Sequence, residues 1–136
     1  MMRVYIASKY IEHTVKNCAI YDALRKASID AFLPESINIS AMNMEEMYKV
    51  SEVCYDEIER CDVILAVCPF GKSVSSELGY AIALKRKFAQ KKIIIGLNVD
   101  FEFEAMLFPY IDKAVDDITQ LIEYLNNIAN YSSAKN

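Results

Sequence analysis

The sequence has few of the residues that build the commonest catalytic and ligand-binding motifs. Its 136 residues include three glycines and one histidine. Neither GxGxxG nor GxxxxGK[ST] is present, which argues against the usual dinucleotide and P-loop motifs. The only histidine, His13, belongs to the start of a predicted helix. A Ser-His-Asp hydrolase is therefore not expected, since its triad needs a base within reach of the serine.

Basic runs and long apolar runs are also missing. The net charge is −4 and no cluster of lysine and arginine extends beyond a few residues, which argues against binding a nucleic-acid backbone. No apolar stretch reaches membrane-spanning length, and residues 1–10 contain no long apolar segment typical of a signal peptide. We therefore expect a cytoplasmic protein without nucleic-acid or membrane partners.

The four cysteines, Cys18, Cys54, Cys61 and Cys68, form no CxxC pair. A zinc site built from them and one histidine would need an unusual set of ligands. We expect reduced cysteines that pack in the interior, and neither a metal nor another cofactor.

Short apolar segments alternate with segments of helical spacing along the chain. Strands are predicted at 3–8, 30–34, 62–68 and 91–97, with a brief edge strand within 112–117. Helices are predicted at 13–28, 44–61, 76–89 and 117–131. The apolar positions of these helices include Val15 and Cys18 in the first, and Met47, Val50 and Cys54 in the second. Residues 1–136 then form one domain, of which 132–136 are expected to fray.

This alternation predicts an α/β fold with a doubly wound parallel sheet, because fully apolar strands must be covered by helices on both faces. Five strands in a chain of this size favour a flavodoxin-like order, 2-1-3-4-5. Such a sheet binds ligands at the carboxyl ends of its first and third strands. Here these ends lead into "SKY" at 8–10 and "CPFGKSVSSE" at 68–77.

Acidic and hydroxyl side chains are concentrated at this predicted edge. They are Tyr5, Ser8, Asp56, Ser73, Ser75, Ser76 and Glu77. The third strand ends in "AVCPF" without an aspartate, so a response regulator is not expected. Glu77 is predicted to lie in the first turn of a helix. There it is either a charge that stabilises the helix end or a carboxylate held ionised as a nucleophile.

Three segments carry a resemblance to a known family: "VYIAS" at 4–8, "DEIERCDVILAV" at 56–67 and "SSELGYAIAL" at 75–84. Together they resemble the nucleoside 2-deoxyribosyltransferases and the related 2′-deoxynucleoside 5′-phosphate N-hydrolases. The resemblance implies that Glu77 attacks C1′ of the sugar and forms a glycosyl-enzyme ester. A second base or water then releases the sugar with retention. It also implies that Asp56 acts on the sugar or leaving base and that Tyr5 contacts nucleophile and sugar. Asp62, at the start of the third strand, is expected to bind local backbone, and Gly79 is expected to let its helix pack closely on the sheet.

The same resemblance indicates how substrate is held. Ser8, Ser73 and Ser75 are expected to bind it, the latter two at positions where relatives often have glycine. "FEAML" at 103–107 resembles a segment that a neighbouring subunit contributes, which places Glu104 and Met106 in the substrate site of a dimer or larger oligomer. The apolar residues of 101–108 are expected at or near this interface. A carboxylate at Glu104 would favour a nucleoside over its 5′-monophosphate.

The leading interpretation is therefore a cofactor-free enzyme of nucleotide salvage. It would cleave (2′-deoxy)nucleosides and transfer the sugar to another free nucleobase. Two alternatives stay open: a nucleoside 5′-monophosphate N-glycosidase that transfers to water, and a nucleotide-binding module without catalytic activity.

Overall fold

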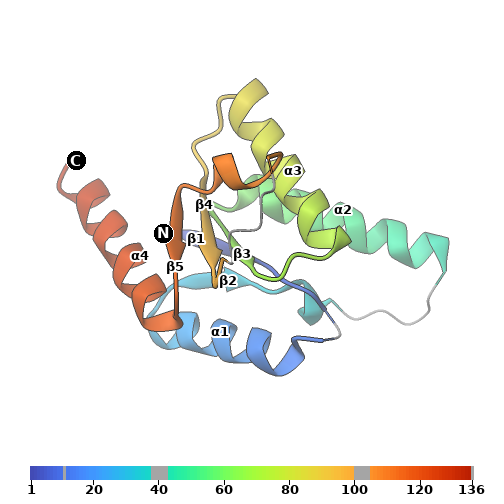
Figure 1. The fold of residues 1–136 in the computed structure, drawn as a ribbon, viewed down its shortest axis with the longest axis horizontal. Coiled ribbons are helices and arrows are strands. Elements are labelled where there is room, and N and C mark those ends of the chain that lie inside the picture. The colour runs from blue at the N-terminus through green and yellow to red at the C-terminus, as the bar shows by residue number, and fades with distance from the viewer. Residues whose placement is uncertain (11, 38–42, 100–104, 136) are drawn as a thin grey trace.

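The computed structural model describes residues 1–10, 12–37, 43–99 and 105–135. Its five strands are β1 (Arg3–Ala7), β2 (Asp30–Phe32), β3 (Val63–Val67), β4 (Ile93–Leu97) and β5 (Lys113–Val115). Its α-helices are α1 (Thr14–Lys26), α2 (Met44–Arg60), α3 (Lys72–Lys87) and α4 (Ile118–Ser133). The strands form one parallel sheet in the order β2-β1-β3-β4-β5, which confirms the predicted flavodoxin-like fold (Figure 1).

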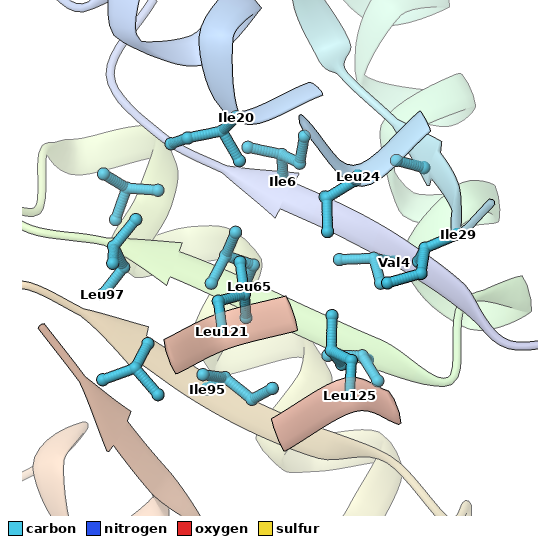
Figure 2. Close-up of a cluster of buried hydrophobic side chains, with 14 of the residues drawn as sticks. Val4, Ile6, Ile20, Leu24, Ile29, Leu65, Ile95, Leu97, Leu121 and Leu125 are labelled. Carbon is cyan, nitrogen blue, oxygen red and sulfur yellow. The ribbon is translucent and has the colours of Figure 1, made fainter. Parts of the chain in front are cut away.

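Helices cover both faces of the sheet, with α1 and α4 on one side and α2 and α3 on the other (Figure 1). Side chains alternate between the faces along β1. Val4 and Ile6 therefore join the core beneath α1 and α4, which Figure 2 shows. Tyr5 and Ala7 join the core beneath α2 and α3. This alternation decides on which side of the sheet the Tyr5 hydroxyl lies.

The C-terminal end of α2 is fixed by a buried cation. Lys92, only 6% exposed, donates from Nζ to the carbonyls of Glu59 at 2.8 Å and Cys61 at 2.7 Å. These carbonyls lie in the last turn of α2 and just beyond it, where backbone acceptors lack partners within the helix. Arg3 adds an ion pair to Glu57 at 2.7 Å. The second half of α2 is thereby tied to the sheet.

The predicted burial of the cysteines is only partly correct. Cys18, Cys54 and Cys61 are free thiols, and Cys61 and Cys68 are buried as expected. Cys18 is exposed and its expected burial is wrong, because α1 turns Asn17, not its neighbour, toward the interior. Val15 in the same helix is 87% exposed. Cys54 is half-buried.

The structural roles expected for Asp62 and Gly79 have different outcomes. Asp62 accepts a hydrogen bond from the backbone N–H of Arg3 at 2.9 Å, as a structural residue would. Gly79 was expected to let its helix approach the sheet closely, and this is wrong, because a Cβ there would have no atom within 4 Å. The crowded glycine is Gly96 in β4, where a Cβ would lie 2.2 Å from Cγ2 of Val99.

Two further predictions concerned the C-terminal segment and membrane-spanning helices. α4 extends through Ser133 and so includes the first two residues of the segment 132–136. Among the described residues, no helix is both long and apolar enough to cross a membrane.

Candidate active site

A cavity of about 440 Å³ lies between α2 and α3. Its lining residues come from the facing sides of these helices: Met47, Val50, Ser51, Cys54 and Tyr55 from α2, and Lys72, Ser73, Ser76 and Glu77 from α3. The start of α3 follows the end of β3, so the cavity lies at the edge of the sheet where ligands were expected. Within the described part of the chain, no group of three or more His, Cys, Asp or Glu residues could hold a metal ion.

Glu77 lies in the second turn of α3, not in its first. The helix begins at Lys72, and its first turn contains no acidic residue. The hydroxyl of Ser75 donates to the carbonyl of Gly71 at 3.0 Å, and residues 72–75, which were expected before the helix, belong to it. The prediction that Glu77 lies in the first turn is therefore wrong. The alternative in which its charge stabilises the helix end is wrong as well, since the macrodipole acts mainly on the first turn.

Burial dominates the electrostatics of Glu77. It raises the pKa of this carboxyl from 4.5 to about 7, while the nearby hydroxyl of Tyr5 acts in the opposite direction. Oε2 of Glu77 is buried and has no hydrogen-bond partner. With a pKa of about 7, this carboxyl is only partly ionised at neutral pH, and the ionised form, which its surroundings stabilise poorly, is the one that could act as a nucleophile.

Tyr5 provides the hydroxyl group beneath this carboxylate. Its side chain is fully buried, and its hydroxyl makes no hydrogen bond of standard geometry. Burial raises the pKa of Glu77 and of Cys54, and the nearby Tyr5 hydroxyl acts in the opposite direction on both. Burial raises the pKa of Tyr5, so the hydroxyl keeps its proton and remains a donor. The structure thus brings together side chains from β1, α2 and α3.

Asp56 does not line the cavity of Glu77. It is exposed on α2 and lies in a neighbouring depression with Glu52, Glu59 and Tyr80. Tyr55 and Ser76 line both hollows and separate them. In this structure Asp56 is therefore close to the site but not beside Glu77.

The predicted substrate-binding residues have different surroundings. Ser73 lines the cavity, whereas the hydroxyl of Ser75 is occupied by the carbonyl of Gly71. Oγ of Ser8 is buried without a hydrogen-bond partner. Met106 is 76% exposed and is absent from the cavity lining. Glu104 lies outside the described residues.

Six lining residues were missed as site residues: Met47, Val50, Ser51, Cys54, Tyr55 and Lys72. Among them, the spacing of Met47, Val50 and Cys54 along α2 was interpreted only as a core pattern. The signal that identifies them as cavity residues is the length of α2, whose N-terminal end extends beyond the sheet (Figure 1). Ser76 was placed at the edge but was not predicted to bind substrate.

Comparison with known proteins identifies the fold. No protein-family model and no curated protein sequence matches the chain. Among solved structures, the 2-deoxyribosyltransferase of Bacillus psychrosaccharolyticus superposes with a TM-score of 0.65 at 16% identity, covering 88% of this chain and 90% of that one. The fold is that of the deoxyribosyltransferases.

Two further deoxyribosyltransferase-like structures extend this similarity. The CMP N-glycosidase of Clostridium botulinum matches with a TM-score of 0.54 at 17% identity, over 93% of this chain and 98% of that one. The 2-deoxyribosyltransferase of Leishmania mexicana matches with a TM-score of 0.50 at 24% identity, over 71% and 64% of the two chains. These structures confirm the fold that the sequence resemblance implied.

Proposed function

We propose that this chain cleaves the N-glycosidic bond of (2′-deoxy)nucleosides through Glu77 and transfers the sugar to another nucleobase. The observation that carries this proposal is the buried, unpartnered Oε2 of Glu77 in a cavity beside the Tyr5 hydroxyl. The deoxyribosyltransferase fold supports it, because the same edge of the sheet binds ligands in folds of this kind.

The chemistry is a double displacement. An oxygen of Glu77 forms a bond to C1′ while the C1′–N bond breaks, and the departing base keeps the electron pair and takes up a proton. A nitrogen of the second base then attacks C1′, the ester bond breaks, and the carboxylate is restored as the incoming base loses a proton. Two inversions give net retention. The carboxylate acts both as nucleophile and as leaving group, so these steps need no cofactor.

The other side chains have roles that follow from their positions. The Tyr5 hydroxyl lies close enough to Glu77 to favour the ionised form of its carboxyl, against the dominant effect of burial. Ser73 and Ser76 line the cavity and offer hydroxyls to sugar or base. Met47 and Val50 give it an apolar wall on which a nucleobase can pack. For Asp56, a role in catalysis requires that substrate extend past Tyr55 into the neighbouring depression.

A second candidate is hydrolysis of a nucleoside 5′-monophosphate. Lys72 lines the cavity, and carbons of the Lys9 side chain lie 3.2 and 3.3 Å from where a Cβ of Gly71 would be, at the start of α3. Two cations at a helix N-terminus favour an anionic group. The structural similarity to a CMP N-glycosidase points the same way. Glu104 opposes it by roughly a hundredfold if its carboxylate lies about 4 to 6 Å from the phosphate.

We also propose that the site is completed by self-association, with segment 103–107 of a neighbouring copy closing it. Met106 in this segment is 76% exposed, as an interface residue of an isolated chain would be. Light scattering should show a dimer or larger oligomer, and activity should fall on dilution. A monomer that stays fully active at nanomolar concentration would contradict this arrangement.

The deciding experiment is base exchange. A deoxynucleoside incubated with a foreign purine should yield the exchanged nucleoside, and Glu77→Ala should abolish this reaction. Glu123→Gln, an exposed change on α4, is the matched control and should keep full activity. Free base alone would indicate hydrolysis, and binding without turnover would indicate the non-catalytic module. A slow 2′-fluoro analogue should leave a sugar adduct on the peptide that contains Glu77.

The substrate charge is tested separately. We expect kcat/KM to be higher for the deoxynucleoside than for its 5′-monophosphate, and Glu104→Ser to narrow the difference. A preference of the unmodified enzyme for the monophosphate would favour the N-glycosidase.

A further inference from the structure

One fully buried amide joins two loops at the carboxyl edge of the sheet. Asn17 on α1 has no exposed surface, and its Nδ2 donates to the carbonyl of Lys9 at 2.9 Å and to a carboxylate oxygen of Glu35. Because both partners are acceptors, only the NH2 group of the amide can face them. Lys9 lies in the loop after β1, and Glu35 lies in the 3₁₀ helix η1 (Pro34–Ser36) after β2. Asn17 therefore fixes both loops to α1.

From this fixed backbone the Lys9 side chain extends to the start of α3. Its Cγ and Cε lie 3.2 and 3.3 Å from the position that a Cβ of Gly71 would take. Gly71 is the N-cap of α3, and the two residues after it line the cavity of Glu77. The Lys9 ammonium pairs with Glu12 at 3.3 Å, but the Glu12 side chain is 69% exposed, and an exposed ion pair contributes little. An anionic group of a substrate can therefore take the place of Glu12.

We propose that Asn17 is a positioning residue that holds Lys9 across Gly71, and that the Lys9 ammonium thereby favours substrates that carry an anionic group. This inference rests on the proposed cleavage of nucleosides or their 5′-monophosphates in the cavity of Glu77. It stands on two observations: the two hydrogen bonds donated by a fully buried amide, and the close approach of the Lys9 side chain to Gly71.

The hydrogen bonds of Asn17 explain why its loss would change the position of Lys9. Lys9 is half-buried, and a carbonyl that loses its donor there is stabilised again only by turning toward water. That movement takes the Lys9 side chain away from Gly71. α3 keeps its own first-turn bond, from the amide of Ser75 to the carbonyl of Gly71 at 3.0 Å. The loss of Asn17 should therefore displace a charge at the edge of the site and leave Glu77 in place.

Four variants separate the two hydrogen bonds of Asn17. Asn17→Leu has nearly the same volume and no donor. Glu35→Gln keeps an oxygen that accepts from Asn17 and removes only the charge. The exchanged pair, Asn17→Asp with Glu35→Gln, restores a bond between these two positions but leaves the Lys9 carbonyl without a donor. Asn126→Leu makes the first change on the exposed face of α4 and is the matched control.

The first measurement locates the Lys9 side chain by NMR, after circular dichroism has established that each variant is folded. Nuclear Overhauser effects between the Lys9 methylenes and the Hα protons of Gly71 report their contact. These signals should be present in the unmodified protein, in Glu35→Gln and in Asn126→Leu, and lost in Asn17→Leu and in the exchanged pair. Where Asn17→Leu does not fold, the exchanged pair carries the test. Signals that persist when Asn17 is replaced would overturn the proposal.

The second measurement compares a deoxynucleoside with its 5′-monophosphate. Asn17→Leu should lower kcat/KM for the monophosphate relative to that for the nucleoside by about fivefold, the counterpart of one partly exposed charge pair. The loss should appear in KM, with kcat for the nucleoside nearly unchanged. If the monophosphate binds without reacting, its inhibition constant against the nucleoside takes the place of kcat/KM. Equal losses for both substrates would show that Asn17 is only structural.

A double variant tests whether Asn17 acts through Lys9. Lys9→Met removes the charge and should reduce the same ratio about as much as Asn17→Leu does. Adding Asn17→Leu to Lys9→Met should reduce it no further, because two changes that act through one group are not additive. A second reduction of full size would contradict the proposed role of Asn17.

Failure of this inference is distinguishable from failure of the proposed function. The NMR contact is observed without turnover. If no nucleoside or nucleotide reacts or binds, the proposed function is wrong and the selection of anionic substrates is refuted with it, while the NMR signals still decide whether Asn17 positions Lys9. If base exchange requires Glu77 but the substrate ratio does not respond to Asn17→Leu, only the role of Asn17 in substrate choice is refuted.

Discussion

Replacing Glu77 by glutamine should abolish turnover and, at the same time, stabilise the free protein above neutral pH. Glutamine keeps the shape of the side chain and removes its ionisation. The folded chain binds a proton at Glu77 more tightly than the unfolded chain, because burial raises the pKa from 4.5 to about 7. The unmodified protein therefore has this stabilisation fully below pH 4.5 and loses it as the pH rises through about 7.

The size of the effect follows from the same two values. The complete change in pKa corresponds to about 3 kcal/mol in the free energy of unfolding, of which about 2 to 3 kcal/mol is lost between pH 5 and pH 8. The glutamine side chain has no ionisable group, so the variant does not lose stability through this titration. Its stability relative to the unmodified protein should therefore increase by about 2 to 3 kcal/mol over that interval.

Urea unfolding at pH 5 and pH 8, followed by circular dichroism, measures this difference. Glu123→Gln on α4 serves as control, because it removes an exposed charge and should give nearly the same stability difference at both values of pH. If the advantage of Glu77→Gln is the same at pH 5 and pH 8, Glu77 is not the buried, uncompensated acid described above.

Three further predictions concern ionisation and packing. The kcat/KM of the unmodified enzyme should rise with pH through about 7 as Glu77 ionises, and a profile that is flat from pH 5 to 9 would contradict a carboxylate nucleophile with this pKa. Lys92→Met should lower the free energy of unfolding by about 1 to 3 kcal/mol, because two carbonyls at the end of α2 lose their donor; an unchanged urea midpoint would show that water replaces it. Gly96→Ala should destabilise by about 1 to 3 kcal/mol through its clash with Val99, and Val99→Ala in the same chain should recover most of this loss.

The sheet could be predicted because its signal is local and strong. β3 and β4 are continuous apolar segments, and the rule for parallel strands then leaves few arrangements. The start of α3 could not be placed in the same way. "GKSVSS" has the composition of a loop, yet Gly71 takes the extended backbone before the helix and the Ser75 hydroxyl bonds back to it. Because the helix was predicted to begin four residues too late, Glu77 was placed in its first turn and not in its second.

The walls of the site were harder to predict than Glu77. An apolar face on α2 has the same pattern whether a sheet or a cavity lies against it, so Met47, Val50 and Cys54 could be recognised as one apolar face but not as cavity residues. Asp56 was predicted at the site but does not line the cavity. It lies two residues after Cys54, and side chains two apart on a helix point in different directions, so both cannot face the same cavity.

The position of Tyr5 in a central strand divides the site into parts of unequal stability. β1 is hydrogen-bonded to β2 on one side and β3 on the other, so the amide of Tyr5 can exchange with solvent only when the sheet itself opens. The wall of the cavity formed by the first half of α2 is different, since Met44 and Tyr48 there are 78% and 65% exposed while the other end of the helix is fixed by Lys92. Hydrogen exchange should therefore be slow at the floor of the site and fast at this wall, and fraying of this helix end would leave Tyr5 in place.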